Sequence, residues 1–148
     1  METAPEIERA ASLFEQGFSC SQAVFSAYAD QFGLDAEIAL RVSGAFGGGM
    51  GRIGATCGAV TGALMVIGLK YAKTKPEDDD SKERTYALVQ QFADLFQQRN
   101  GSTLCKELLG YDLSTPEGRQ QVEEKGISKT LCPHLVRSAV EILELILG

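Results

Sequence analysis

The sequence predicts an all-α protein: a compact single domain spanning residues 1–148, with about six to eight helices and a glycine-rich loop before a buried central helix. Three observations predict this class. Apolar residues recur with helical spacing along most of the chain. Residues that start and stop helices stand between these segments. No segment shows the period-two alternation of a strand or the turn residues of a hairpin.

Two helices are expected in the first 33 residues. The first begins at Pro5 and ends at Gly17, because proline suits the first helical position and glycine breaks a helix. Ser19 is a typical N-cap for the second helix, and Gln22, three residues later, completes a capping box. Gly33 is the expected end of this helix.

A third helix is expected to begin after Asp35, a typical N-cap residue. Its apolar spacing predicts that Ile38, Val42 and Ala45 face the core. Glycines from Gly47 onward then interrupt the helix and form a loop.

A fourth helix is expected from roughly Cys57 to Lys73, with Thr56 as its cap. Apolar residues occur nearly all round this helix, which is typical of a central, buried position. Gly58 and Gly62 predict tight packing against another helix, because glycine lets two backbones approach closely.

The second half of the chain predicts four further helices. The acidic segment KPEDDDSKE should lead into a long helix, since negative charge favours a helix N-terminus. Its expected inward stripe is Tyr86, Val89, Ala93 and Phe96. The expected positions are about 80–99 for the long helix, about 103–109 for a short one, a start at Thr115-Pro116 for the next, and a start at Cys132-Pro133 for the last.

Composition and charge exclude some classes of partner. The formal net charge is −6 and the pI is about 4.8, so a phosphate backbone is an unfavourable partner. The longest apolar stretch, Ala59 to Leu69, is too short to span a bilayer. The first residues resemble no secretory signal, so we expect a cytoplasmic protein without a membrane span. A homo-oligomer remains an open alternative.

The four cysteines share one local setting. Cys20, Cys57, Cys105 and Cys132 all fall at or near predicted helix N-termini. Free N–H groups and the positive end of the helix dipole stabilise a thiolate there, and the thiolate is both the nucleophile and the metal ligand. Cys57 is the best candidate for a thiol of low pKa. The alternative is that the cysteines simply fill the core.

The spacing of the cysteines limits the metal sites that they can form. Gaps of 37, 48 and 27 residues contain no C-x-x-C pair. They therefore match no zinc finger, local ferredoxin pattern or haem attachment motif. Any shared metal or cluster would need ligands brought together from four distant helices.

The glycine loop formally contains G-x-G-x-x-G at Gly49, Gly51 and Gly54. A dinucleotide site needs a preceding strand and a later acidic residue, and the sequence has neither. We interpret these glycines, with Gly58, as a nest of N–H groups that binds a thiolate, a cluster sulfide or a small anion. Arg52 either adds positive charge to this cofactor-binding loop or is a surface side chain.

His134, the only histidine, also has two interpretations. It lies two residues after Cys132 and could serve as a base or a ligand. A single histidine in the first turn of a helix is more often a polar surface residue. Its role stays open.

The segment from Cys57 to Gly62, CGAVTG, is a C-G-A-x-x-G motif. One further cysteine lies upstream in GFSCSQAV, and two lie downstream in TLCKELLG and LCPHLV. With these motifs the chain resembles the C_GCAxxG_C_C family of redox-active proteins over nearly its whole length. The resemblance implies a mostly helical protein whose four cysteines act together in redox chemistry or hold a metal or iron–sulfur centre.

The sequence therefore predicts a redox-active protein, either an oxidoreductase or an electron-transfer protein. Its four cysteines would hold an iron–sulfur cluster or another soft metal, or perform thiol–disulfide exchange with Cys57 as nucleophile. Either form needs a redox partner protein, which the sequence does not identify. The alternatives are a helical binding module that partners a redox enzyme or transporter, and a protein with a structural zinc site.

Overall fold

A computed structural model describes residues 4–147, which contain ten α-helices, one 3₁₀ turn and no strand. Residues 1–3 and 148 of the predicted domain lie outside this range. Eight of the helices have five or more residues, which confirms the predicted class. They are α1 Pro5–Glu15, α2 Cys20–Ala29, α3 Ala36–Gly44, α5 Gly58–Tyr71, α6 Asp79–Asn100, α7 Cys105–Leu109, α8 Pro116–Glu124 and α10 Cys132–Leu147. Three single turns complete the set: η1 Asp30–Phe32, α4 Gly47–Met50 and α9 Ile127–Thr130.

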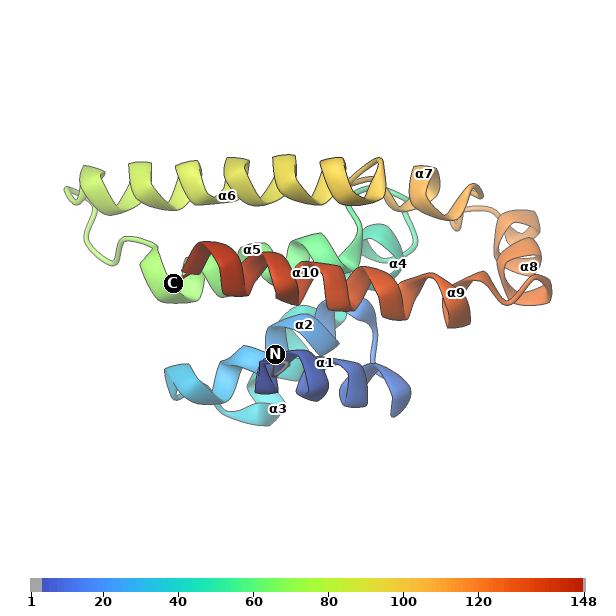
Figure 1. Cartoon of the computed structure of the whole chain (residues 1–148), viewed down its shortest axis with the longest axis horizontal. Helices are drawn as coiled ribbons and strands as arrows, with labels where there is room; N and C mark the ends of the chain where they lie inside the picture. Colours follow the sequence, from blue (N-terminus) through green and yellow to red (C-terminus); the bar gives the residue numbers. More distant parts are fainter. Residues whose placement is uncertain (1–3, 148) are drawn as a thin grey trace.

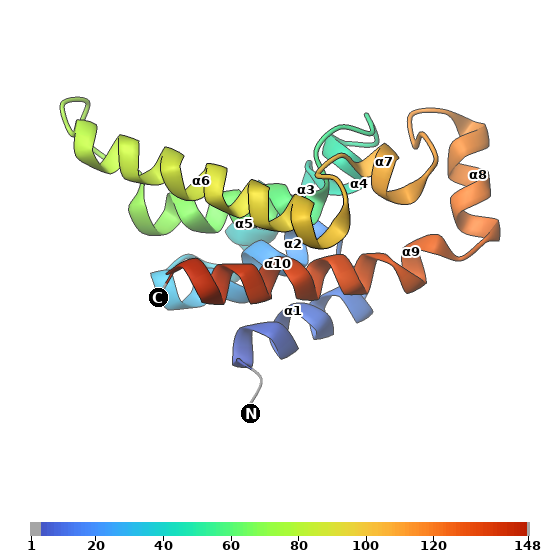
Figure 2. The ribbon, with the colours of Figure 1, turned by 45° about the horizontal axis from the view of Figure 1, so that its top comes forward.

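Helices α2 and α5 pack against each other at the centre of the molecule. Helices α1 and α3 cover α2 on one side, α6 covers α5 on another, and α10 contacts α1, α2, α5 and α6. Figure 1 shows α6 and α10 running along the long axis, with α7, α8 and α9 at one end beside α4. In Figure 2, α9 leads almost directly into α10. The chain therefore has a long helical body and a smaller end built from short helices.

The central position of α5 is confirmed. Eight of its fourteen residues are buried, and they point in all directions around the helix. Gly62 explains how closely it approaches α2: a Cβ atom added there would lie 2.8 Å from the carbonyl oxygen of Ser21. A Cβ atom at Gly58 would lie 3.0 Å from the backbone nitrogen of Ser21. Tight packing at both glycines is therefore confirmed.

The predicted capping residues of two early helices are also confirmed. Ser19 caps α2, and its side chain and that of Gln22 form the complete capping box. The carboxylate of Asp35 accepts a hydrogen bond from the backbone N–H of Ile38 at the start of α3. Local side-chain chemistry alone sets these boundaries, which is why the sequence revealed them.

The predicted inward face of α3 is wrong. Ile38 and Val42 are 49% and 50% exposed, and Ala45 is exposed as well. Ala39 and Ser43 are buried instead. The reason is the close approach of α3 to α2, where the hydroxyl of Ser21 donates a hydrogen bond of 2.8 Å to the carbonyl oxygen of Ser43. Only small residues fit between two helices at that separation.

The predicted stripe of α6 is partly wrong. Tyr86 is 54% exposed, and Thr85 is buried in its place. Phe96 is buried as predicted, and its ring stacks on that of Phe92 with the ring centroids 6.0 Å apart. These two phenylalanines determine which face of α6 turns inward, because they bury more apolar area than any neighbouring residue. Val89 and Ala93 are half-buried.

Buried apolar side chains form two separate clusters. The main core lies among α1, α2, α3, α5, α6 and α10, and its largest members include Tyr28, Phe92 and Ile142. The small core lies among α7, α8 and α9 and has only three buried members, Cys105, Leu109 and Val122. Cys57 is part of the main core, and the partly buried Cys20 packs against it. The partly buried Cys132 packs against the small core.

No helix in residues 4–147 is both long enough and apolar enough to cross a bilayer.

Candidate functional site

All four cysteines lie at the start of a helix, as the sequence predicted. Cys20, Cys105 and Cys132 are the first residues of α2, α7 and α10. Cys57 is itself the N-cap of α5. The four helices come from distant parts of the chain, and their first turns meet at the junction between the two cores.

Two of these starts are joined by backbone hydrogen bonds. Thr56 and Leu104 form an isolated antiparallel bridge, so Thr56 has an extended backbone and is not the cap that the sequence predicted for α5. Two bonds flank the bridge: the N–H of Cys57 donates to the carbonyl oxygen of Thr103 at 2.8 Å, and the N–H of Cys105 donates to that of Ala55 at 2.7 Å. The backbone itself therefore fixes Cys57 beside Cys105.

The glycine-rich loop contains a left-handed turn. Residues 48–52 all have positive φ, with values between 67° and 71°. L-residues adopt this conformation at a cost of roughly 1–2 kcal/mol each, and glycine adopts it freely. Glycine occupies three of the five positions, and Met50 and Arg52 occupy the other two. The turn includes the last three residues of α4, and α4 contacts both α5 and α7.

The turn brings glycine backbone against the cysteines. A Cβ atom added at Gly49 would lie 2.6 Å from the Cβ of Cys105. Gly58 lies similarly close to Cys20, since a Cβ atom at Gly58 would lie 3.3 Å from the Cβ of Cys20. Both glycines therefore make room for a neighbouring cysteine.

The four cysteines line one cavity of about 170 Å³. No charged side chain and no histidine lines it in the described part of the chain. The other lining residues are apolar, small or hydroxylic: Phe14, Leu108, Leu109, Leu113 and Leu135; Gly48, Gly49 and Gly58; Ser19 and Ser128. The cavity is thus an apolar space whose reactive groups are four thiols.

Burial and mutual contact give the four thiols different pKa values. Burial raises the pKa of Cys57 to about 11 and that of Cys105 to about 12. Cys20 and Cys132 form a thiol–thiol hydrogen bond, which raises the pKa of Cys20 and lowers that of Cys132. The hydroxyl of Ser128 also hydrogen-bonds Cys132 and lowers its pKa.

Cys57 is therefore not the low-pKa thiol that its helix position predicts. The backbone N–H groups of Ala59 and Val60 do lower its pKa, but the loss of water outweighs them. Cys132 has the lowered pKa instead, because a neighbouring thiol and a hydroxyl lower it by more than partial burial raises it.

The other predicted site residues are divided between the cavity and its surroundings. Gly49 and Gly58 line it, whereas Gly51, Arg52 and Gly54 do not. Gly54 is buried against Lys106, and Arg52 lines a second, neighbouring cavity. His134 is exposed on the first turn of α10 and does not line the cysteine cavity.

Ser128 and Leu113 also border the cavity, and sequence reasoning did not identify them. Neither lies near a cysteine in a recognisable motif. The helix spacing of Ser128, four residues before Cys132, was the one available signal, because residues four apart share a helix face.

No three or more His, Cys, Asp or Glu side chains among residues 4–147 are arranged to hold a metal ion. The four cysteines are four of the fourteen residues that line the cavity. Four sulfurs bound to one zinc ion at about 2.3 Å would lie only about 3.8 Å apart. The arrangement therefore differs from a preformed site for a single ion.

The fold and the cavity define an all-helical protein with a buried four-thiol centre. The family model described as "Putative redox-active protein (C_GCAxxG_C_C)" matches residues 18–146, and the chain belongs to this family. All four cysteines lie within the match, so the resemblance seen in the sequence is confirmed. A search of curated proteins and a search of solved structures each found no match to the chain.

Proposed function

We propose that the protein transfers electrons and that Cys20, Cys57, Cys105 and Cys132 hold an iron–sulfur cluster. One observation carries the proposal: four thiols from four distant helices line a single cavity with otherwise apolar walls. Iron–sulfur clusters are commonly held by four cysteine thiolates. A redox partner protein would supply or accept the electron.

The space between the thiols supports a cluster over a single ion. Four ligands of one zinc ion leave no cavity between them, whereas these four surround about 170 Å³. In a cluster, inorganic sulfide and several iron atoms separate the protein ligands. A structural zinc site, the alternative that the sequence left open, would require the four thiols to move together.

The chain contributes burial and hydrogen bonding at this centre. When bound, an iron–sulfur cluster supplies one-electron chemistry. The N–H groups of Ala59 and Val60 lower the pKa of Cys57, and donors near a ligand sulfur stabilise negative charge on it. The apolar wall excludes water, and Gly49 and Gly58 let the backbone come close without a side chain in the way.

The raised pKa values of three thiols affect how a metal centre would assemble. Cys57, Cys105 and Cys20 hold their protons at neutral pH in the metal-free protein. Because metals bind thiolates, loading must release these protons and should become more favourable as pH rises.

A second function has one specific observation in its favour. Cys20 and Cys132 are hydrogen-bonded to each other and only half-buried, and the pKa of Cys132 is lowered. The Cys132 thiolate could attack a substrate disulfide and release one substrate thiolate. Cys20 would then attack the mixed disulfide, release the second thiolate and form a Cys20–Cys132 disulfide.

Anaerobic purification with iron, zinc, sulfide and thiol analysis of one sample tests the proposal. We expect a brown protein with iron and acid-labile sulfide and with no titratable cysteine thiols. Zinc without sulfide would support the structural alternative. A colourless, metal-free protein with four thiols would contradict the cluster.

Single Cys→Ser variants separate the two redox functions. A four-ligand cluster predicts that C57S and C105S lose iron and absorbance as C20S and C132S do. Dithiol exchange predicts that C57S and C105S keep insulin-disulfide reductase activity, while C20S and C132S lose it. Leu108→Met is a matched control, since Leu108 borders the same cavity and its side chain offers neither a thiol nor a hydrogen bond.

A further inference from the structure

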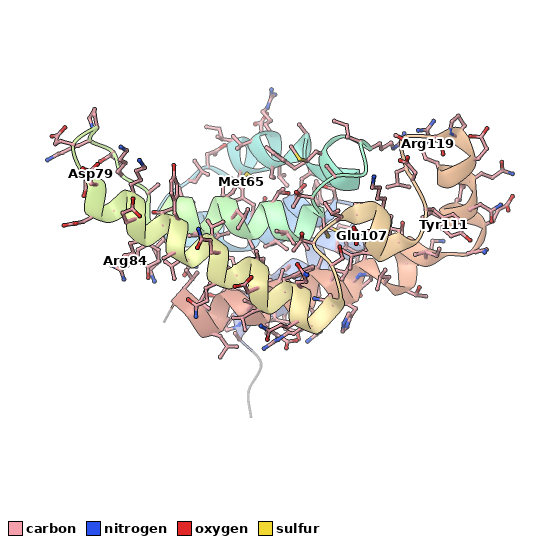
Figure 3. All side chains as sticks on the ribbon, turned by 90° about the horizontal axis from the view of Figure 1, so that it is seen from above. Met65, Asp79, Arg84, Glu107, Tyr111 and Arg119 are labelled. Carbon is pink, nitrogen blue, oxygen red and sulfur yellow. The ribbon has the colours of Figure 1, made fainter. Side chains whose placement is uncertain are left out.

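A second cavity, of about 510 Å³, lies beside the cysteine cavity. Three cationic side chains line it: Arg52 from the left-handed turn, Arg119 from α8 and Lys129 from α9. Glu123 is the one carboxylate among its lining residues. Figure 3 shows Arg119 at the α8 end of the molecule, far from Asp79 and Arg84 at the opposite end.

The charge of this cavity is opposite to that of the protein as a whole. The chain carries a formal net charge of −6, yet three cations face one carboxylate here. Among residues 4–147, the ion pairs within 4.0 Å involve neither Arg52, Arg119 nor Lys129. Three cations with only one carboxylate leave an excess of positive charge, so the arrangement favours an anionic ligand.

The fold holds the guanidinium of Arg119 and the backbone of Arg52 in place. The guanidinium of Arg119 donates a hydrogen bond of 2.8 Å to the carbonyl oxygen of Leu113. Arg52 has a φ of 70°, which few residues other than glycine adopt. Its side chain folds back over Gly48, since a Cβ atom at Gly48 would lie 3.0 Å from the Cγ of Arg52. Backbone strain of this kind occurs preferentially at functional sites.

The two cavities share a wall. Leu113 and Ser128 line both, and the hydroxyl of Ser128 hydrogen-bonds the thiol of Cys132. A ligand in the second cavity would therefore lie one side chain away from the four-thiol centre.

We propose that the second cavity binds a small oxyanion with two or more negatively charged oxygens. Arginine suits such a group, because its planar guanidinium can donate two parallel hydrogen bonds to phosphate, sulfur oxyanions or carboxylates. The anion is either free in solution or part of a nucleotide. The proposal does not depend on a cluster, because none of the three cations lines the cysteine cavity.

Isothermal titration calorimetry of the full-length protein with inorganic pyrophosphate, at constant ionic strength, tests the proposal. We expect saturable binding at one site per chain. Lys129→Gln and Arg52→Asn should each weaken it roughly tenfold, the effect of losing one partly exposed charged hydrogen bond. Asparagine is chosen at position 52 because it tolerates a positive φ.

Lys125→Gln is the matched control. Lys125 is an exposed lysine four residues from Lys129 and does not line the cavity. Removing its charge should weaken binding less than about threefold, through long-range electrostatics alone. Circular dichroism of each variant checks that the fold is intact.

A parallel titration with ADP distinguishes the two sources of the oxyanion. Tighter binding of ADP than of pyrophosphate would identify a nucleotide, and equal or weaker binding would identify a free oxyanion. The proposal is overturned if pyrophosphate does not bind saturably, or if K125Q weakens binding as much as K129Q and R52N do.

Discussion

The two cores of the molecule differ in how much apolar area they bury. The main core unites six helices around fully buried side chains such as Tyr28, Phe92 and Phe96. The small core has three buried members, and one of them is Cys105. Burial of apolar area is the main stabilising contribution to folding, so the main core can stand without a ligand. The small core buries little apolar area, so we expect its stability to depend on the cysteine centre.

The cysteines join these two regions. Cys20 and Cys57 pack in or against the main core. Cys105 and Cys132 pack in or against the small core. A group bound by all four would crosslink the two cores. Stability and redox chemistry are therefore expected to depend on different parts of one chain, and substitutions can separate them.

The largest effect on global stability is expected at Gly62. Gly62→Ala would place a Cβ atom 2.8 Å from the carbonyl oxygen of Ser21, between the two central helices. We expect a loss of about 1–3 kcal/mol in the free energy of unfolding, measured by urea denaturation, because backbone cannot yield easily in a packed core. Gly68→Ala is the control on the same helix: it meets nothing within 4 Å and should stabilise by up to about 1 kcal/mol. Equal effects of the two variants would contradict the assigned packing.

The next effect is expected at Gly49 and should be confined to the cysteine centre. Gly49→Ala would place a Cβ atom 2.6 Å from the Cβ of Cys105 and adds strain at a φ of 70°. We expect the variant to lose most of its bound iron or its dithiol activity, while its far-UV circular dichroism stays close to wild type.

Gly51→Ala is the control for that variant. It has a similar φ of 67°, but its Cβ atom would come no closer than 3.5 Å to Ala45. The variant should therefore lose only the about 1–2 kcal/mol of stability that backbone strain costs, and it should retain the cysteine centre. If G51A loses the centre as fully as G49A, the turn's conformation and not the contact with Cys105 is what matters.

Removal of any bound metal should affect the two cores unequally. We expect amide hydrogen exchange in α7, α8 and α9 to accelerate by at least about tenfold on chelation, with little change in α2, α5 and α10. The reason is that the ligand stabilises the region with few apolar contacts of its own. Uniform acceleration throughout the chain would mean that the two cores unfold as one unit.

A further effect is expected in the pH dependence of the metal-free protein. Burial raises the pKa of Cys57 from an ordinary value of 9.0 to about 11, so the folded state keeps this proton longer than the unfolded chain does. The contribution to stability is complete below pH 9 and is lost as pH rises through about 11. The measurement is the difference in unfolding free energy between pH 8 and pH 10.5, compared with Cys57→Ala. A variant whose pH dependence equals that of wild type would contradict the assigned burial.

Much of the fold could be predicted because its signals are local. The capping box of Ser19 and Gln22 fixes one helix start, and the all-round apolar pattern identifies α5 as central. Gly58 and Gly62 were identified as contact points, because glycine on a buried helix has few other uses. The inward faces of α3 and α6 were harder, since apolar spacing does not reveal how closely a neighbouring helix approaches.

The sequence identified the four cysteines of the candidate site, but not which glycines line the cavity or the electrostatics of the thiols. The sequence placed four cysteines at helix starts and associated them with the glycine-rich loop. It could not show that burial raises the pKa of Cys57 by more than nearby N–H groups lower it. Nor could it show that Cys132 lies beside Cys20 and Ser128. Such pKa shifts depend on depth and on neighbours from other helices.

By itself, then, the sequence determined the helical class, the caps of α2 and α3 and the identity of the four thiols, because backbone propensity and capping act within a few residues. Only the tertiary structure decided that Thr56 pairs with Leu104, that residues 48–52 turn left-handed, and that three cations meet beside the cysteine cavity. The bridge and the three cations join segments that are up to about eighty residues apart in the chain. Packing between distant helices creates them, and no local pattern encodes such packing.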